Sequence, residues 1–200
     1  ILEGAFDVSG GYFSRLVDGE WTASAVFNGE VGMDSAIGDS NPASPGNEII
    51  VGTEMGPVYE ITPQLDEPPG KFDEWPRRTL WNDFDNAPWT LRIADVLPDV
   101  PGNEIVYGTR YNDRILLSRE SADGKNHDMQ VLFTGLATKP MTMWDIAVGD
   151  FVPEAGGSPT LEIIGVDDDG YAYLVERDSA GVWSGQPMWQ DPGATSDGGL

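Results

Sequence analysis

The sequence predicts an all-β fold of the β-propeller class, built from four-stranded units of about 55 residues each. One phrase recurs along the chain: a Gly-Asp or Ala-Asp pair, a turn-rich loop, and a Glu that leads a short β-branched run. The three copies place this Asp at positions 39, 95 and 150, which differ by 56 and 55 in turn. Repetition at this period is typical of arrays and propellers, whose units bury their apolar faces only against neighbouring units. The 25 Gly and 15 Pro also suit many short strands joined by turns.

Four strands are expected in each repeat. The first strands end at the recurring Asp and span 33–39, 89–95 and 143–150. The second strands follow Glu48, Glu104 and Glu162 and are nearly all apolar, which predicts burial on both faces. After tight turns at 54–56, 111–113 and 168–170, the third strands are expected at 58–61, 115–118 and 171–175. The fourth strands are expected at 75–81, 128–133 and 183–189, and the loops at 62–74, 119–127 and 176–182 should be exposed.

The segment 1–32 fits the same template, entered partway through. Gly10 and Gly11 predict the hairpin turn, 12–13 the third strand and 21–27 the fourth strand. We therefore expect one propeller region over 1–200, with a partial blade at 1–32 and blades at 33–88, 89–142 and 143–200. The chain would be part of a larger ring within a longer polypeptide. The alternative is a four-bladed ring in which the two chain ends share one blade.

Large aromatic side chains keep the same period in the fourth strands. The positions of Phe27, Trp81, Phe133 and Trp189 differ in turn by 54, 52 and 56. Six positions before them stand Trp21, Trp75, His127 and Trp183. Rings at this spacing could form a sugar-binding face, but repetition at the blade period favours one ring per blade that wedges between adjacent sheets.

Charge and composition restrict the partners of the chain. Thirty-four acids against 11 Lys and Arg give a formal net charge of −23. This charge disfavours nucleic acid and anionic membranes as partners, because both attract basic patches. No apolar run is long enough to insert through a bilayer. The absence of Cys excludes disulfides and thiolate metal sites.

The repeat resembles the FG-GAP family of β-propeller repeats, the integrin-type repeats also called VCBS. The resemblance lies in the Asp that closes the first strand, the acid that opens the second, and the Gly-x-Val-Tyr of the third at 56–59. It implies a non-enzymatic extracellular or cell-surface module that binds a protein or glycan through blade loops. The alternative is the propeller part of a carbohydrate-active enzyme, a polysaccharide lyase or a sugar dehydratase.

The resemblance also implies calcium as a candidate cofactor in the loops between first and second strands, where hard oxygen ligands would surround the ion. The candidate ligands are Asp39, Asn41, Asp95, Asp99, Asp150 and Glu154. The pattern is broken, since Ala43, Leu97 and Val152 occupy other ligand positions. The loop residues themselves therefore favour turn caps through side-chain to backbone hydrogen bonds. The run 167–169 is a further candidate cation site, although a hairpin tip is expected there.

Catalytic patterns are weak. The single His127 stands in a polar stretch that predicts an exposed loop, and no Gly-x-Ser-x-Gly elbow accompanies it. The acid pairs Asp83 with Asp85, and Glu60 with Asp66, have the residue types of a glycosidase, but such pairs arise by chance among 34 acids. Arg110 and Arg114 flank a hairpin tip and could hold an acidic sugar. Neutralisation of neighbouring acids is the expected role of these two arginines.

Overall fold

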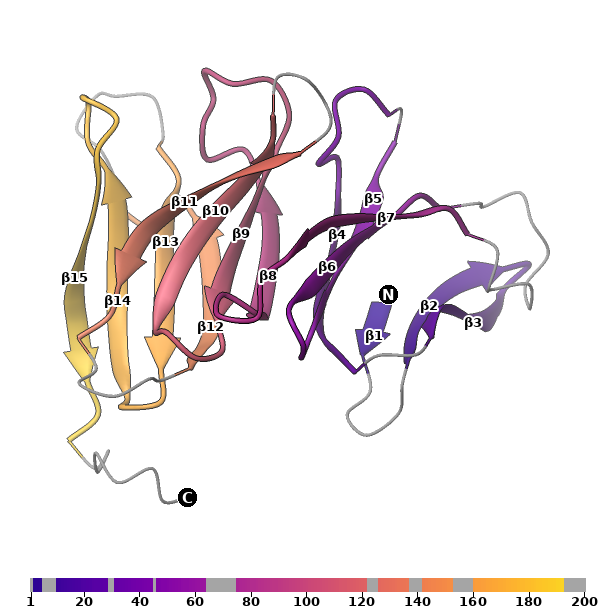
Figure 1. The fold of residues 1–200 in the computed structure, drawn as a ribbon, viewed down its shortest axis with the longest axis horizontal. Coiled ribbons are helices and arrows are strands. Elements are labelled where there is room, and N and C mark those ends of the chain that lie inside the picture. The colour runs from indigo at the N-terminus through magenta and orange to yellow at the C-terminus, as the bar shows by residue number, and fades with distance from the viewer. Residues whose placement is uncertain are drawn as a thin grey trace.

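The computed structural model describes residues 2–4, 10–28, 31–44, 46–63, 75–121, 126–136, 142–152 and 160–192. Every regular element in these ranges is a β-strand (Figure 1). In the same ranges, no helix has the length and apolar character needed to cross a membrane. The all-β class that the sequence predicts is confirmed.

The strands form one three-stranded sheet and three four-stranded sheets, and within each sheet consecutive strands of the chain pair antiparallel. The first sheet contains β1 (Leu2–Gly4), β2 (Gly10–Val17) and β3 (Glu20–Asn28). The second contains β4 (Gly32–Gly38), β5 (Glu48–Thr53), β6 (Pro57–Ile61) and β7 (Arg77–Asn82). The third contains β8 (Pro88–Ala94), β9 (Glu104–Thr109), β10 (Arg114–Glu120) and β11 (His127–Thr134). The fourth contains β12 (Met143–Gly149), β13 (Glu162–Asp167), β14 (Tyr171–Arg177) and β15 (Trp183–Gln190).

Two β-bulges recur at equivalent positions and show that the sheets are copies of one unit. In the first strand of each four-stranded sheet, one residue is skipped in the pairing with the second strand; the skipped residues are Met33, Trp89 and Trp144. In the fourth strand of each four-stranded sheet and in β3, one residue is skipped in the pairing with the preceding strand; these are Val26, Leu80, Leu132 and Met188. A bulge bends the strand and redirects the neighbouring side chains.

The second strands form the centre of each core, as their apolar sequences predict. All six residues of β5 and all six of β9 are buried. Both faces are covered because another sheet packs against each side. Gly52 and Gly108 permit the closest approach: a Cβ at Gly52 would lie 2.6 Å from Cγ of Pro88, and one at Gly108 would lie 2.7 Å from Cγ of Met143.

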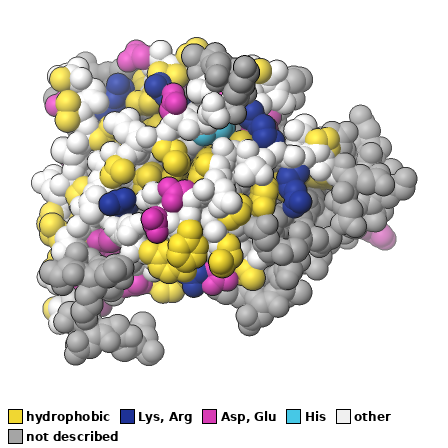
Figure 2. All heavy atoms as spheres, viewed as in Figure 1, with side chains coloured by type: hydrophobic (Ala, Val, Ile, Leu, Met, Phe, Trp, Pro, Cys, Tyr) yellow, Lys and Arg dark blue, Asp and Glu magenta, His cyan; other side chains and the backbone are white. Residues whose placement is uncertain are grey.

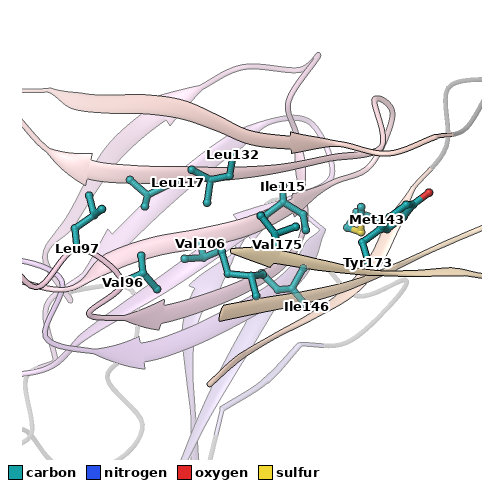
Figure 3. Packing of buried hydrophobic residues seen from close by; sticks show 11 residues of the cluster. Val96, Leu97, Val106, Ile115, Leu117, Leu132, Met143, Ile146, Tyr173 and Val175 are labelled. Atoms are coloured by element: carbon teal, nitrogen blue, oxygen red, sulfur yellow. The ribbon is translucent and has the colours of Figure 1, made fainter. Parts of the chain in front are cut away.

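Successive sheets stack face to face through the aromatic wedges that the sequence predicts. Trp81 of the second sheet stacks on Tyr107 of the third, with ring centroids 5.4 Å apart. Phe133 of the third sheet packs on Tyr173 of the fourth at 4.8 Å. The largest apolar cluster lies between these two sheets and contains Ile115 and Val175 (Figure 3). The first strands β4, β8 and β12 also contact one another in turn along the stack.

The sheets do not close into a ring. The sheet of β1 to β3 and the strand β15 lie at opposite ends of the molecule (Figure 1). Trp189 has no described sheet stacked on it, and it is 57% exposed, compared with 8% for Trp81. The described residues therefore show no wedge contact for Trp189, and its expected role stays a prediction. The side chain of Phe27 lies outside the described residues.

Several local expectations need correction. Gly10 and Gly11 belong to β2 and pair with β1 and β3, so the hairpin turn does not lie there. Trp75 precedes β7 and is not part of it. His127 is the first residue of β11 and is half-buried, because its ring tilts against Trp81 at 5.7 Å. The polar residues next to His127 in the sequence do not predict this contact, because Trp81 belongs to another sheet.

Replacing Trp81 with Ala should lower the free energy of unfolding by about 3–5 kcal/mol, because the change leaves a cavity between two sheets. Trp189→Ala is the matched control at the equivalent exposed position, and it should change stability by less than about 0.5 kcal/mol. Urea unfolding followed by circular dichroism measures both. Equal losses in the two variants would contradict the wedge assignment.

Candidate functional site

Aromatic side chains gather around Arg110 at the end of the second, third and fourth sheets that carries the β5–β6 and β9–β10 turns. The group, called here the Arg110 surface, consists of Phe84, Trp89, Arg110, Tyr111 and Trp144. Phe84 lies in the β7–β8 connection, and Arg110 and Tyr111 follow β9. Trp89 and Trp144 are the skipped residues of the bulges in β8 and β12. The bulges therefore place two indole rings at this end of the stack.

The rings of the Arg110 surface form a continuous set of contacts. Trp89 and Trp144 meet edge to face with centroids 4.9 Å apart. The guanidinium of Arg110 lies 5.5 Å from the ring centre of Trp89 and 4.9 Å from that of Tyr111. Tyr111 in turn lies 5.1 Å from Phe84. Trp144 is 51% exposed and Phe84 is 49% exposed, so ring area remains open to solvent.

Polar contacts hold Arg110 in place. Its guanidinium donates to Oε1 of Glu54 at 2.5 Å, which links the third sheet to the second. Its backbone N–H donates to the carbonyl of Ala87, and its carbonyl accepts from Oγ1 of Thr142. Figure 2 shows hydrophobic side chains gathered in patches on the side of the molecule seen in Figure 1, beside acidic and basic groups. The Arg110 surface thus combines open rings with a fixed ion pair.

The two arginines that the sequence singled out have different partners. Arg110 neutralises Glu54, as expected. The guanidinium of Arg114 donates to the side-chain oxygen of Asn86 at 3.3 Å, and its backbone N–H donates to Thr109.

Beside the two indoles, an ion-pair chain crosses the first strands of three sheets. Arg92 of β8 pairs with Asp34 of β4 at 3.1 Å and with Asp145 of β12 at 2.6 Å. Asp34 also accepts from the backbone N–H of Leu91, and Asp145 accepts from the hydroxyl of Thr90. These bonds fix β8 and β12, which carry Trp89 and Trp144, relative to each other.

The predicted calcium ligands lie at the opposite end of the sheets, in the loops after β4, β8 and β12. The side chains of Asp39, Asp95, Asp99 and Asp150 are exposed, and Glu154 lies outside the described residues. Asn41 acts as a turn cap, since its side-chain oxygen accepts from the N–H of Ala43 at 3.0 Å. Within the described part of the chain, no three His, Cys, Asp or Glu side chains come together as a metal site. Calcium binding in these loops stays a prediction.

The Glu of the repeated phrase has a structural role in each four-stranded sheet. One carboxylate oxygen accepts two backbone N–H groups from the loop that precedes it. Glu48 accepts from residues 40 and 41, Glu104 from 96 and 97, and Glu162 from 151 and 152, at distances between 2.6 and 3.2 Å. These bonds satisfy loop donors that the strands leave unpaired. The expectation of side-chain to backbone caps in these loops is confirmed for these acids.

A cavity of about 500 Å³ opens at the same end, between the loops of the second and third sheets. Its walls include Pro42, Val100, Asn103, Glu104 and Arg119. Burial raises the pKa of Glu104 to about 7, although the two N–H groups of residues 96 and 97 act against this shift. The cavity has polar oxygen atoms and apolar groups in its walls. The Glu104 carboxylate, however, already accepts hydrogen bonds from the N–H groups of residues 96 and 97.

The remaining acids of interest are also part of the structure. Asp83 accepts from the N–H groups of residues 85 and 86, so it caps a turn. Glu60 pairs with Arg78 at 2.8 Å, and Asp66 lies outside the described residues. Asp167 ends β13 and accepts the hydroxyl of Tyr173 at 2.6 Å. The run 167–169 is thus a hairpin tip, as expected, with its first acid buried.

His127 occupies a closed environment. Its Nδ1 lies 3.0 Å from the hydroxyl of Ser118, which is fully buried. Its Nε2 is buried without a hydrogen-bond partner among the described residues. Burial, with a smaller contribution from Arg78, lowers the pKa of His127 to about 4. The imidazole is therefore neutral at pH 7, and the Ser118 hydroxyl is closed to a substrate.

No protein-family model matches the chain, and no curated protein matches it.

Sequence reasoning identified Arg110 but missed Trp89 and Trp144 as site residues. Both stand in apolar first strands, where period-two alternation assigns them to the core. The recurring position of Met33, Trp89 and Trp144, six positions before the repeated Asp in each copy, was the available signal.

Glu104→Ala should lower the free energy of unfolding by about 1–3 kcal/mol, because the buried N–H of Leu97 loses its acceptor and the N–H of Val96 keeps only the carbonyl of Ala94. Glu104→Gln should cost much less, since its carbonyl oxygen can accept from both N–H groups. Thermal and urea unfolding of the two variants measures the difference. If Gln and Ala cost the same, the carboxylate does not act through these two bonds.

Stability should fall in acid through His127. The unfolded chain takes up a proton near pH 6.5, whereas the folded chain does so only near pH 4, so the free energy of unfolding falls as the pH is lowered between these values. His127→Gln stays neutral throughout this range and should lack this component. Urea titrations of both proteins at pH 7, 6, 5 and 4 give the test. Parallel pH profiles would show that His127 protonates freely in the fold.

Proposed function

We propose that the chain is a non-enzymatic binding module of FG-GAP-type propeller repeats, and that it recognises a protein or glycan ligand through the Arg110 surface. The observation that carries this proposal is the set of open rings around Arg110 at one end of the sheets. Exposed Trp144 and Phe84 offer apolar area, and the Arg110–Glu54 pair beside them offers directed polar groups.

The arrangement is already ordered before any ligand binds. Arg110 is fixed by Glu54, by two backbone contacts and by the rings on either side. A fixed site loses little conformational entropy on binding, and Trp, Tyr and Arg are the side chains that contribute most to binding hot spots. These features support recognition of a ligand more than they support a reaction.

The module is proposed to act outside the cell or at its surface, as the resemblance implies. The net charge of −23 is consistent with a soluble ligand or a neutral glycan and disfavours polyanionic partners. No contact in the described residues favours the alternative, the propeller part of a polysaccharide lyase or a sugar dehydratase.

Binding to an array of neutral and acidic glycans, together with purified extracellular-matrix proteins, tests the proposal. If the array or the protein set identifies a ligand, Trp144→Ala should weaken its binding by at least about tenfold, because the change removes an exposed ring from the Arg110 surface. The control is Trp21→Ala, which removes a Trp that is 63% exposed on β3, in another sheet. Both variants should keep the unfolding midpoint of the parent chain.

Equal binding by the parent chain and Trp144→Ala would show that the Arg110 surface is not the site. Cleavage of an array glycan by the parent chain would support the enzyme alternative instead.

A further inference from the structure

The cavity between the loops of the second and third sheets contains polar groups that the fold does not use. Its walls come from the β4–β5 loop, the β8–β9 loop, and the adjoining ends of β10 and β11. Its volume of about 500 Å³ is in the range of pockets that hold small organic ligands. The cavity lies at the opposite end of the sheets from the Arg110 surface, so an inference drawn from it does not rest on the function proposed above.

Arg119 of β10 lines this cavity and is half-buried. Its guanidinium makes no ion pair, hydrogen bond or ring contact with any other described residue, unlike every other arginine whose side chain the structure describes. The chain holds 34 acids against 11 Lys and Arg, so an arginine left without a carboxylate partner is unexpected. Because a guanidinium binds a carboxylate through two parallel N–H groups, Arg119 is available for the carboxylate of a ligand.

Two other polar groups in the walls are also unengaged within the described part of the chain. Ser40 is 4% exposed, and its hydroxyl has no hydrogen-bond partner there. A buried hydroxyl in this state is costly unless a bound polar group satisfies it. The Asp128 carboxylate accepts no hydrogen bond from a described residue, and Asp128 pairs directly with Arg119 in the register of β11 and β10. Directly paired residues of an antiparallel sheet share a face, so a positive and a negative side chain start side by side.

The charges of the walls restrict the class of ligand. Glu104 and Glu120 also line the cavity, and both are engaged: Glu104 by two loop N–H groups, and Glu120 by Arg78 at 2.8 Å. With Asp128, they place three carboxylates around one free guanidinium, which disfavours a phosphate or another polyanion. A ligand with one carboxylate and one ammonium group matches both charges, since Asp128 can accept from the ammonium.

From these groups we propose that the cavity binds a small zwitterion, an amino acid or a short peptide with apolar side chains. Arg119 holds the carboxylate of the ligand, and Asp128 accepts from its ammonium group. The hydroxyl of Ser40 gains a polar partner. Pro42 and Val100 of the walls provide apolar contact for the side chains of the ligand.

The test screens the 200-residue chain by its melting temperature and then by calorimetric titration. The panel consists of leucine, phenylalanine and a leucine tripeptide, each also in its N-acetyl and its carboxamide form. Inorganic phosphate and a neutral hexose represent the other classes of ligand. A ligand that binds the folded chain raises its melting temperature. Only compounds with both a free ammonium and a free carboxylate should do so, and the tighter binder among them distinguishes a free amino acid from a peptide.

Two variants assign the charges of the ligand to residues. Arg119→Gln should weaken binding of the zwitterion by at least about tenfold and should no longer distinguish it from its carboxamide form. Asp128→Asn should no longer distinguish it from its N-acetyl form. Because neither side chain bonds to another described residue, both variants should keep the unfolding midpoint of the parent chain.

Arg114→Gln is the matched control, since it removes the same charge from the other end of β10, outside the cavity walls; it should bind as the parent does. The proposal is overturned if no zwitterion binds at up to about 10 mM, or if Arg119→Gln binds as tightly as the parent. Tighter binding of phosphate or the hexose than of every zwitterion would also overturn it. Loss of binding in Trp144→Ala would place the zwitterion at the Arg110 surface instead. Each of these results is separate from the glycan and protein binding that tests the proposed function.

Discussion

The contact between one sheet and the next determines most of this structure. A four-stranded sheet with apolar residues on both faces cannot bury them alone, so each sheet depends on its neighbour. The closest points are a large ring from the fourth strand and a Gly in the second strand. Trp81 reaches Tyr107 of the next sheet, while Gly52 admits Pro88. The aromatic ring and the space left by the glycine together set the distance between successive sheets.

The two ends of the sheets differ because different local interactions form them. At one end, Glu48, Glu104 and Glu162 each hold a loop through two backbone N–H groups. A carboxylate used in this way is withdrawn from metal binding or catalysis. At the other end, bulges place Trp89 and Trp144 beside Arg110. The repeated framework thus engages its strand-opening carboxylates at one end and leaves aromatic ring area exposed at the other.

β1 and the full length of β2 were not predicted from the sequence. Period and residue type were sufficient, however, to predict the strands of the three four-stranded sheets, the turn caps and the wedge at Trp81 and Phe133. These features depend on contacts that every repeat makes in the same way. Three others could not be predicted, since each depends on one particular neighbour. Trp144 leaves the alternation of its strand at a bulge, His127 is covered by a ring of another sheet, and Trp189 lacks a covering sheet in the described structure. Sequence periodicity contains no information on which copy is last in a stack.

The scarce arginines explain how so acidic a chain can stack its sheets closely. Like charges at each seam would drive the sheets apart, and three arginines are placed to prevent this. Arg78 joins Glu60 of its own sheet to Glu120 of the next, Arg92 joins Asp34 to Asp145, and Arg110 reaches Glu54. A half-exposed ion pair contributes only about 0–1 kcal/mol in isolation. At a seam between acidic faces, however, removing the arginine would also leave the carboxylates facing each other. The positive charges therefore matter through the repulsion that they prevent.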